Sequence, residues 1–253
     1  MDSENLVGEA KTLISEATKK GVILRVFGGV AIRSHCPSAA QSPLTRRLAD
    51  IDLFGLSKQS TAIQMVFADL SYLPARSFNA LHGNKRMMFF EPKSQVRRDV
   101  FLDWFVMCHK FDFRKRLDID TFSIPLADLL MTKLQVVEIE ERDFKDIICI
   151  ILDHELANSD VEETINQKYI ADICSNDWGI YTTFAHNLVK AQTYLQGLEL
   201  ENSKKALVEA KMQTFAKAIE QAPKSMKWKS RSLVGEKMPW YELPEVPKTI
   251  RFE

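Results

Sequence analysis

The stretch VILRVFGGVAIRSHCPSAAQSPLTRRLADIDLF, residues 22–54, contains the pattern that decides the fold. It begins with an apolar segment typical of a strand, continues through a Gly-Gly pair and a short amphipathic segment, and ends in a second strand-like segment that contains Asp50 and Asp52. Side chains two residues apart on a strand point to the same face, so these carboxylates are expected to project together. Ionised carboxylates this close repel one another unless a cation lies between them, and Mg²⁺ prefers such oxygen ligands. The pattern therefore predicts a metal site.

Gly28 and Gly29 lie between the two expected strands and supply the other half of the predicted site. Glycine has no Cβ, so a ligand can approach its backbone closely. A turn that opens a helix also presents unpaired N–H groups and the positive end of the helix dipole, which favour phosphate. A Gly-Gly pair alone is also typical of an ordinary tight turn. Its combination with Asp50 and Asp52 favours phosphate binding.

The two motifs together resemble those of the nucleotidyltransferases of the DNA polymerase beta superfamily. The signature of that family is a strand, a Gly-Gly or Gly-Ser pair opening a helix, Asp-x-Asp on the following strand, and a third carboxylate on a later strand. The matching segments are FGGVA, residues 27–31, and ADIDLF, residues 49–54. Residues 36–48 make the gap between them longer than is usual in the family and look like an insertion. The resemblance implies a nucleoside triphosphate substrate and two Mg²⁺ ions held by Asp50, Asp52 and a third acid.

A further strand is expected over residues 98–105, RDVFLDWF, which include two more acids, Asp99 and Asp103. Both have the same parity on the strand, but four residues at roughly 3.3 Å each separate them, so only one can join the first two aspartates. The resemblance favours Asp99 as the third catalytic and metal-binding acid, because the third carboxylate of the family begins a short strand in a similar setting. Asp103 is the alternative. Either acid could instead be a surface residue of an edge strand, although charged residues are depleted within strands.

Two later segments carry a closer resemblance, to the abortive-infection type E toxin nucleotidyltransferases. They are ADLLMTKL, residues 127–134, and RDFKD, residues 142–146. The resemblance implies that Lys133 binds the phosphates of the nucleotide and that Asp143 and Asp146 support the site, by orienting Lys133 or an arginine. Physical chemistry alone also allows Lys133 to be a solvated residue at the margin of an apolar helix face. The two aspartates are equally explained as first-turn acids that the helix dipole favours.

Arg46 and Arg47 directly precede the aspartate motif. Guanidinium groups bind phosphate oxygens through charge-assisted hydrogen bonds, so these arginines are candidates for contact with nucleotide phosphates or with an RNA backbone. We assign Arg47 to the predicted nucleotide site. The alternative is that both arginines are solvated charges of a polar loop.

Histidine and cysteine are adjacent twice, at residues 35–36 and 108–109, which raises the alternative of a zinc site. Neighbouring residues on a strand point apart, and the spacing matches no zinc ribbon or finger. A structural or substrate-contacting histidine is the preferred interpretation.

Composition limits the class of protein. The 253 residues are 45% hydrophobic and contain 34 basic and 34 acidic side chains, so a core can form and no overall charge directs the chain to nucleic acid. The four cysteines show no CxxC spacing, which fits the reducing cytoplasm. No apolar span long enough for a membrane is present, so no membrane association is expected. The sequence does not indicate an oligomeric state.

The expected fold class is α+β: a nucleotidyltransferase-type mixed sheet flanked by helices, followed by a helical C-terminal module. The expected domains are a catalytic domain (1–122), a helical domain (123–222) and an extended basic and aromatic tail (223–253). That tail either binds single-stranded nucleic acid through interleaved cations and Trp228 or wraps its own domain as a strap anchored by Trp228, Trp240 and Tyr241. Helices are expected at residues 3–20, 30–35, 60–70, 161–174, 177–198 and 201–222, and a hairpin of strands 75–81 and 85–91 turning at 82–84.

The predicted function is Mg²⁺-dependent transfer of a nucleoside monophosphate from a nucleoside triphosphate, such as ATP, to a hydroxyl of RNA or protein, with release of pyrophosphate. One alternative is an adenylyltransferase acting on a small hydroxylated molecule such as an aminoglycoside. The other is a non-catalytic nucleotide-binding or interaction protein of the same fold.

Overall fold

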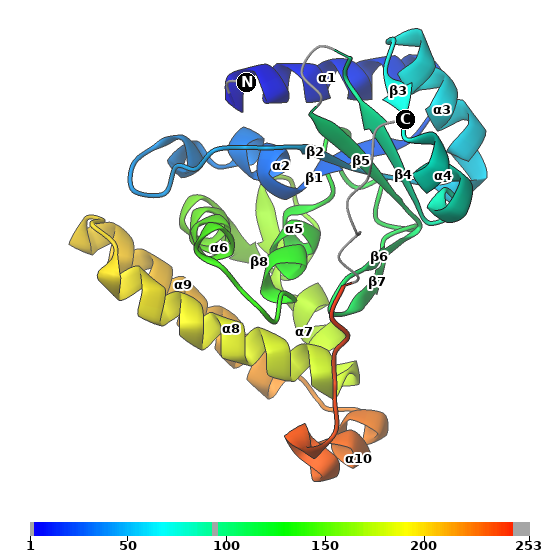
Figure 1. Ribbon diagram of the computed structural model, residues 1–253. Helices are drawn as coiled ribbons and strands as arrows, with labels where there is room; N and C mark the ends of the chain where they lie inside the picture. The colour runs from blue at the N-terminus through cyan, green and yellow to red at the C-terminus, as the bar shows by residue number, and fades with distance from the viewer. Residues whose placement is uncertain (1–2, 93–95, 245–253) are drawn as a thin grey trace.

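The computed structural model describes residues 3–92 and 96–244. The N-terminal half forms a five-stranded sheet in the order β1-β2-β5-β4-β3 (Figure 1). The sheet is mixed, because β2 and β5 are parallel and the other neighbouring pairs are antiparallel. The strands are β1 (Leu24–Phe27), β2 (Ile51–Gly55), β3 (Leu73–Pro74), β4 (Arg86–Phe90) and β5 (Arg97–Leu102).

Two of the predicted helices pack beside this sheet. Helix α1 (Ser3–Lys19) buries an apolar face at every third or fourth residue, including Leu6, Ala10 and Leu13, and contacts β1 and α3 (Ser60–Asp69). Helix α2 (Gly28–His35) begins directly at the end of β1. A 3₁₀ turn at Pro37–Ala40 follows α2, and the chain then runs without regular structure until β2.

The C-terminal half is mainly helical, and the long helices α8 and α9 run side by side below the sheet in Figure 1. Helix α6 begins with a capping box, and the side chains of Asn166 and Asp177 cap α7 and α8. Two small two-stranded sheets lie outside the five-stranded sheet, β6 (Trp104–Val106) with β7 (Lys110–Asp112) before the helical region and β8 (Glu155–Ala157) with β9 (Thr164–Asn166) within it. The helices are α5 (Leu126–Leu134), α6 (Glu141–Asp153), α7 (Gln167–Asn176), α8 (Trp178–Gly197), α9 (Asn202–Gln221) and α10 (Met226–Val234).

The hairpin predicted over residues 75–91 is wrong in its first strand. Residues 85–91 contain β4 as expected, but the preceding segment forms helix α4 (Arg76–His82). The Asn79 side chain donates to the Met88 carbonyl (3.0 Å) and accepts from the Met88 N–H (2.8 Å). The Asn79 side chain thus makes hydrogen bonds to Met88 that the second strand of a hairpin would otherwise make. On that side of β4, only the two-residue strand β3 pairs with it.

The tail predicted to be wholly extended contains a helix. Ser225 accepts a hydrogen bond from the Trp228 N–H (3.2 Å) and caps α10, so the basic residues after Pro223 lie largely on a helix. The Trp228 ring packs edge-on against Tyr181 of α8 (centroids 5.2 Å apart), which matches the strap alternative better than a free stacking surface. Residues 238–244 are extended; Pro247 lies outside the described residues.

The predicted helix over residues 161–174 begins later than expected. Its first residues form β9, and the helix α7 starts after Asn166. One cluster of buried apolar side chains runs from Leu6 to Ile219 and includes residues of all the helices from α5 to α9. The proposed domain bounds remain a prediction, because this core crosses the boundary near residue 123.

The observed architecture is a mixed α+β fold with a small mixed sheet and a helical C-terminal region. Over residues 3–92 and 96–244, none of the helices has both the length and the apolar composition that crossing a membrane requires.

Candidate functional site

The candidate site lies where β1 ends and α2 begins (Figure 1). Pairing across the sheet places Phe27, the last residue of β1, opposite Asp52 of β2, and Asp52 opposite Asp99 of β5. Because β2 and β5 are parallel and in register here, Asp52 and Asp99 are direct neighbours on the sheet. The glycine pair and the aspartates therefore meet at one end of the sheet.

Gly28 accommodates the Asp52 carboxylate. Its φ is +67°, a backbone conformation that residues with a Cβ rarely adopt, and a Cβ built there would lie 2.7 Å from Asp52 Oδ2. Any other residue at position 28 would strain the backbone and collide with this oxygen. The glycine and the aspartate are thus one structural unit, although they are 24 positions apart in the sequence.

Gly29 makes room for Arg46 in a similar way. A Cβ at position 29 would lie 2.5 Å from Arg46 Nη2. Arg46 donates to both oxygens of Asp146, from Nε (2.8 Å) and from Nη2 (2.7 Å). The space beside both glycines, where phosphate contact was predicted, is therefore occupied by protein side chains, although both glycines still line the cavity described below.

Asp99 is fully buried and lies between two arginines. Arg86 Nη2 is 2.9 Å from Asp99 Oδ1, and Arg97 Nε is 2.5 Å from Asp99 Oδ2. The second contact lacks hydrogen-bond alignment, so Oδ2 accepts no hydrogen bond within the described part of the chain. Burial raises the pKa of Asp99, and the charges of Arg86 and Arg97 act in the opposite direction.

Arg97 also reaches Asp50, which directly precedes β2. Arg97 Nη2 lies 3.2 Å from Asp50 Oδ2. Both side chains are partly exposed, 39% for Arg97 and 36% for Asp50. One guanidinium thus bridges two of the three predicted metal-binding acids.

Asp52 has no comparable partner. Its carboxylate lines the cavity and makes no hydrogen bond to any described residue. Burial raises the pKa of Asp52 to about 8, and the nearby charges of Asp50 and Asp99 add to this rise. A carboxyl group with a strongly raised pKa therefore faces the cavity at Asp52.

Asp103, the alternative third acid, is excluded from the site by the backbone. The strand predicted over residues 98–105 breaks at Asp103, where φ is +62°, and divides into β5 and β6. The Asp103 side chain instead binds Ser57, accepting from its N–H (3.0 Å) and its hydroxyl (2.5 Å). The prediction that Asp99 and Asp103 share one face of a strand is wrong for Asp103, because the strand ends before it.

Lys133 lies on α5 and contacts both acids of the RDFKD segment. Its Nζ is 2.8 Å from Asp146 Oδ2 and 3.1 Å from Asp143 Oδ1. Burial alone would lower the pKa of Lys133, but the charges of these two acids outweigh it and hold the pKa above its usual value. Asp143 also accepts from the Glu140 N–H in the capping box of α6. Lys133 thus faces the cavity as a charged ammonium with counter-ions already supplied by the protein.

Arg47 is exposed and does not line the cavity, so the structure does not bring it to the other predicted residues. Arg46, one position earlier, does line it. Residues 45–50 have no regular secondary structure, and Arg46, not Arg47, is the arginine that binds Asp146.

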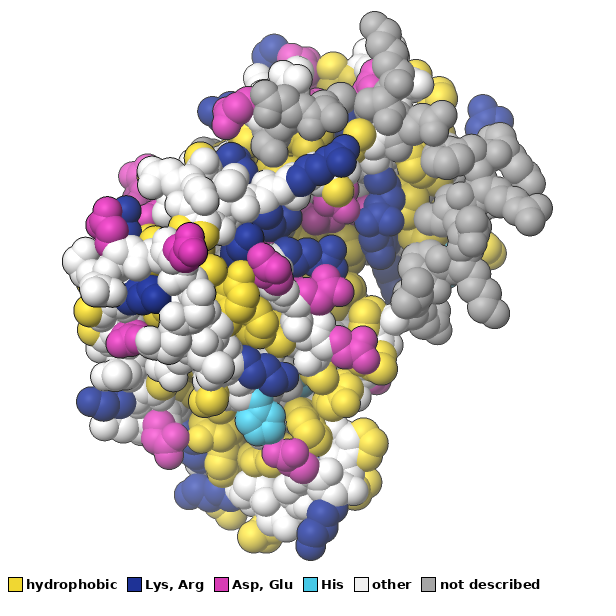
Figure 2. Space-filling view, turned by 60° about the vertical axis from the view of Figure 1, so that its left-hand side comes forward, with side chains coloured by type: hydrophobic (Ala, Val, Ile, Leu, Met, Phe, Trp, Pro, Cys, Tyr) yellow, Lys and Arg dark blue, Asp and Glu magenta, His cyan; other side chains and the backbone are white. Residues whose placement is uncertain are grey.

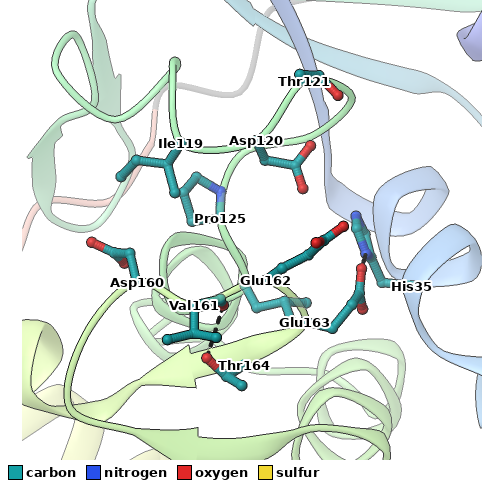
Figure 3. A pocket seen from close by; sticks show the side chains of 11 residues that line it. His35, Ile119, Asp120, Thr121, Pro125, Asp160, Val161, Glu162, Glu163 and Thr164 are labelled. Carbon is teal, nitrogen blue, oxygen red and sulfur yellow. Dashed lines mark hydrogen bonds and ion pairs between the residues drawn. The ribbon is translucent and has the colours of Figure 1, made fainter.

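The two His-Cys pairs do not form a zinc site. His35 Nδ1 is 2.7 Å from Glu163 Oε1 at the wall of a separate cavity of about 230 Å³ (Figure 3). His109 Nε2 lies 2.8 Å from the Thr183 hydroxyl. Over the described ranges, no three His, Cys, Asp or Glu side chains are grouped to hold a metal ion.

The site opens into a cavity of about 430 Å³. Phe101, Phe105 and Met107 form an apolar part of its wall. Its charged lining is balanced, with five basic and five acidic side chains among the described residues. Figure 2 shows basic and acidic side chains gathered together in a recess of the surface. The basic ones that line the cavity are Arg46, Arg86, Arg97, Lys133 and Arg142.

Arg86 and Arg97 also line the site, although neither was predicted from the sequence. A signal for Arg97 was present, because Arg97 and Asp99 are two positions apart and share a face of β5 by the rule applied to Asp50 and Asp52. Arg98 points the other way and pairs with Glu9 of α1. Arg86 reaches Asp99 only through the pairing of β4 with β5, which the sequence does not show.

Asp50 and Asp52 fit a divalent cation, and Asp99 fits one only if its arginines move. Both of the first two acids line the cavity. Burial and, to a lesser degree, the charges of Asp50 and Asp99 raise the Asp52 pKa, and the charge of a bound divalent cation would act against this rise. Asp99 is held by Arg86 and Arg97 and does not line the cavity. The two-ion expectation therefore depends on release of Asp99 by these guanidinium groups.

Comparison with known proteins gives no family for this chain: no family model, no curated protein and no solved structure matches it.

Proposed function

We propose that this protein is a nucleotidyltransferase that transfers a nucleoside monophosphate from a nucleoside triphosphate to a hydroxyl acceptor. The observation that carries the proposal is the packing of the Asp52 carboxylate against Gly28 at the start of α2, beside Asp99 on the parallel strand. This order of strand, glycine pair, helix and two acid-bearing strands is similar to that of the DNA polymerase beta superfamily. The cavity of about 430 Å³ has the size of a small-molecule site.

The reaction is an in-line displacement at the α-phosphorus, in which the bond to the acceptor oxygen forms, the bond to the β-phosphate oxygen breaks, and pyrophosphate leaves. Asp50 and Asp52 would hold Mg²⁺, which when bound supplies positive charge near the attacking and leaving oxygens. Lys133 would bind the β- and γ-phosphates through its charged Nζ. Asp99 would accept the proton of the acceptor hydroxyl after Arg97 has left it.

The test is incubation of the protein with each labelled nucleoside triphosphate, Mg²⁺ or Mn²⁺, and a total cell extract, followed by separation of the products by size. We expect label in a product for the native chain and at least about a hundredfold less for Asp52→Asn, because the central carboxylate is lost. Asp112→Asn is the matched control, since Asp112 is a surface acid that pairs with Arg114 away from the cavity. Native-level incorporation by a folded Asp52→Asn protein would refute the proposal.

The size of the labelled product identifies the acceptor. Label on RNA or protein is expected for a toxin-like nucleotidyltransferase. Label on none of the extract macromolecules, together with labelling of an aminoglycoside panel, would instead identify the small-molecule adenylyltransferase.

A second candidate function, nucleotide binding without turnover, is favoured by one observation. Arg86 and Arg97 neutralise the buried Asp99, which the transfer reaction needs free. Calorimetry with a non-hydrolysable triphosphate analogue separates the two functions. Binding of the analogue without a divalent cation, together with no incorporation from any of the four labelled triphosphates, would support nucleotide binding without turnover.

A further inference from the structure

Two arginines hold the acidic end of the cavity, but they are fixed to different degrees. The Arg86 guanidinium lies over the Phe101 ring, 4.5 Å from its centroid, and also faces Phe78 at 6.0 Å. Its side chain is 24% exposed, whereas that of Arg97 is 39% exposed and has no ring contact within the described part of the chain. Arg97 is therefore the arginine that can leave with less loss of contact.

The contacts of Arg97 conflict with a divalent cation at the same acids. Arg97 binds Asp50 through Nη2, and Asp50 lines the cavity together with Asp52, the acid proposed to share the cation. A cation there would lie close to the guanidinium, and two positive charges a few ångströms apart inside a protein repel strongly. Cation binding and the Arg97 contacts therefore oppose one another.

A second location for Arg97 is available nearby. Arg97 lines the cavity together with Lys133 and Arg142, and the balanced charge of that lining leaves no excess positive charge for a triphosphate. If the Arg97 guanidinium left Asp50 and Asp99, it would supply a positive charge for the triphosphate. Guanidinium groups bind phosphate oxygens in pairs of hydrogen bonds.

We infer that Arg97 changes partners during binding: it is the internal counter-ion of Asp50 and Asp99 in the free protein and becomes a ligand of the nucleotide phosphates when a divalent cation takes its place. The inference rests on the proposed function for the nucleotide. It makes cation and nucleotide binding cooperative, because the cation releases the arginine that the phosphates need.

The first experiment measures Mn²⁺ affinity by calorimetry without nucleotide. Arg97→Ala should bind Mn²⁺ roughly tenfold more tightly than the native protein, a typical size for coupled binding events, because no guanidinium competes for Asp50. Arg97→Lys should stay close to native. Arg114→Ala is the control, since Arg114 is an exposed arginine whose partner is Asp112. Equal or weaker Mn²⁺ binding by Arg97→Ala would overturn the inference.

Loss of Arg97 could unfold the acidic end of the sheet, so a second measurement uses the native chain. The Arg97 Nε–Hε signal in a ¹H–¹⁵N spectrum, assigned by its disappearance in Arg97→Lys, should shift when Mg²⁺ is added and again when a non-hydrolysable triphosphate follows. A signal that stays in place while Mg²⁺ binds would contradict the exchange.

The two proposals fail separately. Tighter Mn²⁺ binding by Arg97→Ala together with no incorporation by the native protein would support the exchange of partners and remove the transfer reaction. Incorporation by the native protein, together with unchanged Mn²⁺ affinity in Arg97→Ala, would support the transfer reaction and remove the exchange of partners.

Discussion

The Asp52 carboxylate is held in the folded protein at the expense of stability, because it is half-buried beside two other acids and has no hydrogen-bond partner among the described residues. Its pKa of about 8 shows the size of this effect, since an exposed aspartate titrates near 4. Gly28 permits the arrangement by leaving the space that Asp52 Oδ2 occupies. Functional residues in proteins often have such a cost.

This cost predicts how stability depends on pH. The pKa of Asp52 is higher in the folded than in the unfolded state, so folding takes up a proton between about pH 4 and pH 8, and the contribution of Asp52 to the free energy of unfolding falls as the pH rises through that range. Asp52→Asn removes this pH-dependent contribution to the free energy of unfolding. The variant should be more stable than the native protein at pH 8 by more than about 1.4 kcal/mol, the equivalent of one pKa unit.

Urea unfolding at several pH values between 5 and 8 measures this difference, which should shrink toward pH 5. Asp112→Asn should show no such gain at high pH, because Asp112 is paired with Arg114 at the surface. An Asp52→Asn protein that is less stable than the native protein at pH 8 would contradict the raised pKa of Asp52.

At the scale of elements, the local signals in residues 22–54 were sufficient to predict β1, α2 and β2. Alternation and the glycine pair identify these elements without knowledge of their neighbours. Asp103 and Asn79 are two residues whose local structure the local sequence signals did not predict. The expected single strand breaks at Asp103, where φ is positive and the side chain binds Ser57. Asn79 lies on a helix, from which its amide binds Met88. Both contacts depend on tertiary structure.

Asn79 should therefore matter more than its partly exposed position suggests. Asn79→Ala removes both hydrogen bonds to Met88 and leaves the Met88 N–H without its partner, which should lower the free energy of unfolding by about 1–3 kcal/mol. Asn84→Ala, at an exposed position just before β4, should change stability by less than about 0.5 kcal/mol. Urea unfolding gives both values, and equal stabilities of the two variants would refute the role of the amide.

At the scale of the whole molecule, the C-terminal segment links the helical region to the cavity. Trp240 lies in a socket on α8, where its Nε1 donates to the Thr183 hydroxyl (3.1 Å) and where a Cβ on Gly179 would be 2.7 Å from the Trp240 carbonyl oxygen. The Glu242 N–H then donates to the Cys108 carbonyl (3.1 Å), at the turn between β6 and β7. Leu243 and the residue after it line the cavity.

The sequence predicted that Gly28, Asp50 and Asp52 would lie near one another, as they do at the cavity, but it did not predict this arrangement of the tail. Asp50, Asp52 and Gly28 belong to a local pattern, whereas the socket requires α8, the β6–β7 turn and the tail to meet. The aromatic residues of the tail were correctly considered as possible anchors. The placement of the tail on α8 depends on Gly179, a residue with no sequence signal of its own, because a Cβ there would collide with the Trp240 carbonyl oxygen.

Because the socket positions the cavity wall, changing it should affect ligand binding from a distance. Trp240→Ala removes the indole from α8 and frees Leu243, so a non-hydrolysable nucleoside triphosphate should bind roughly tenfold more weakly in calorimetry, the loss expected when one large apolar contact is removed. Met238→Ala is the control, because Met238 lies on the same segment and is 59% exposed. Its affinity should stay at the native level. Native affinity in Trp240→Ala would mean that residues 238–244 pack beside the cavity without shaping it.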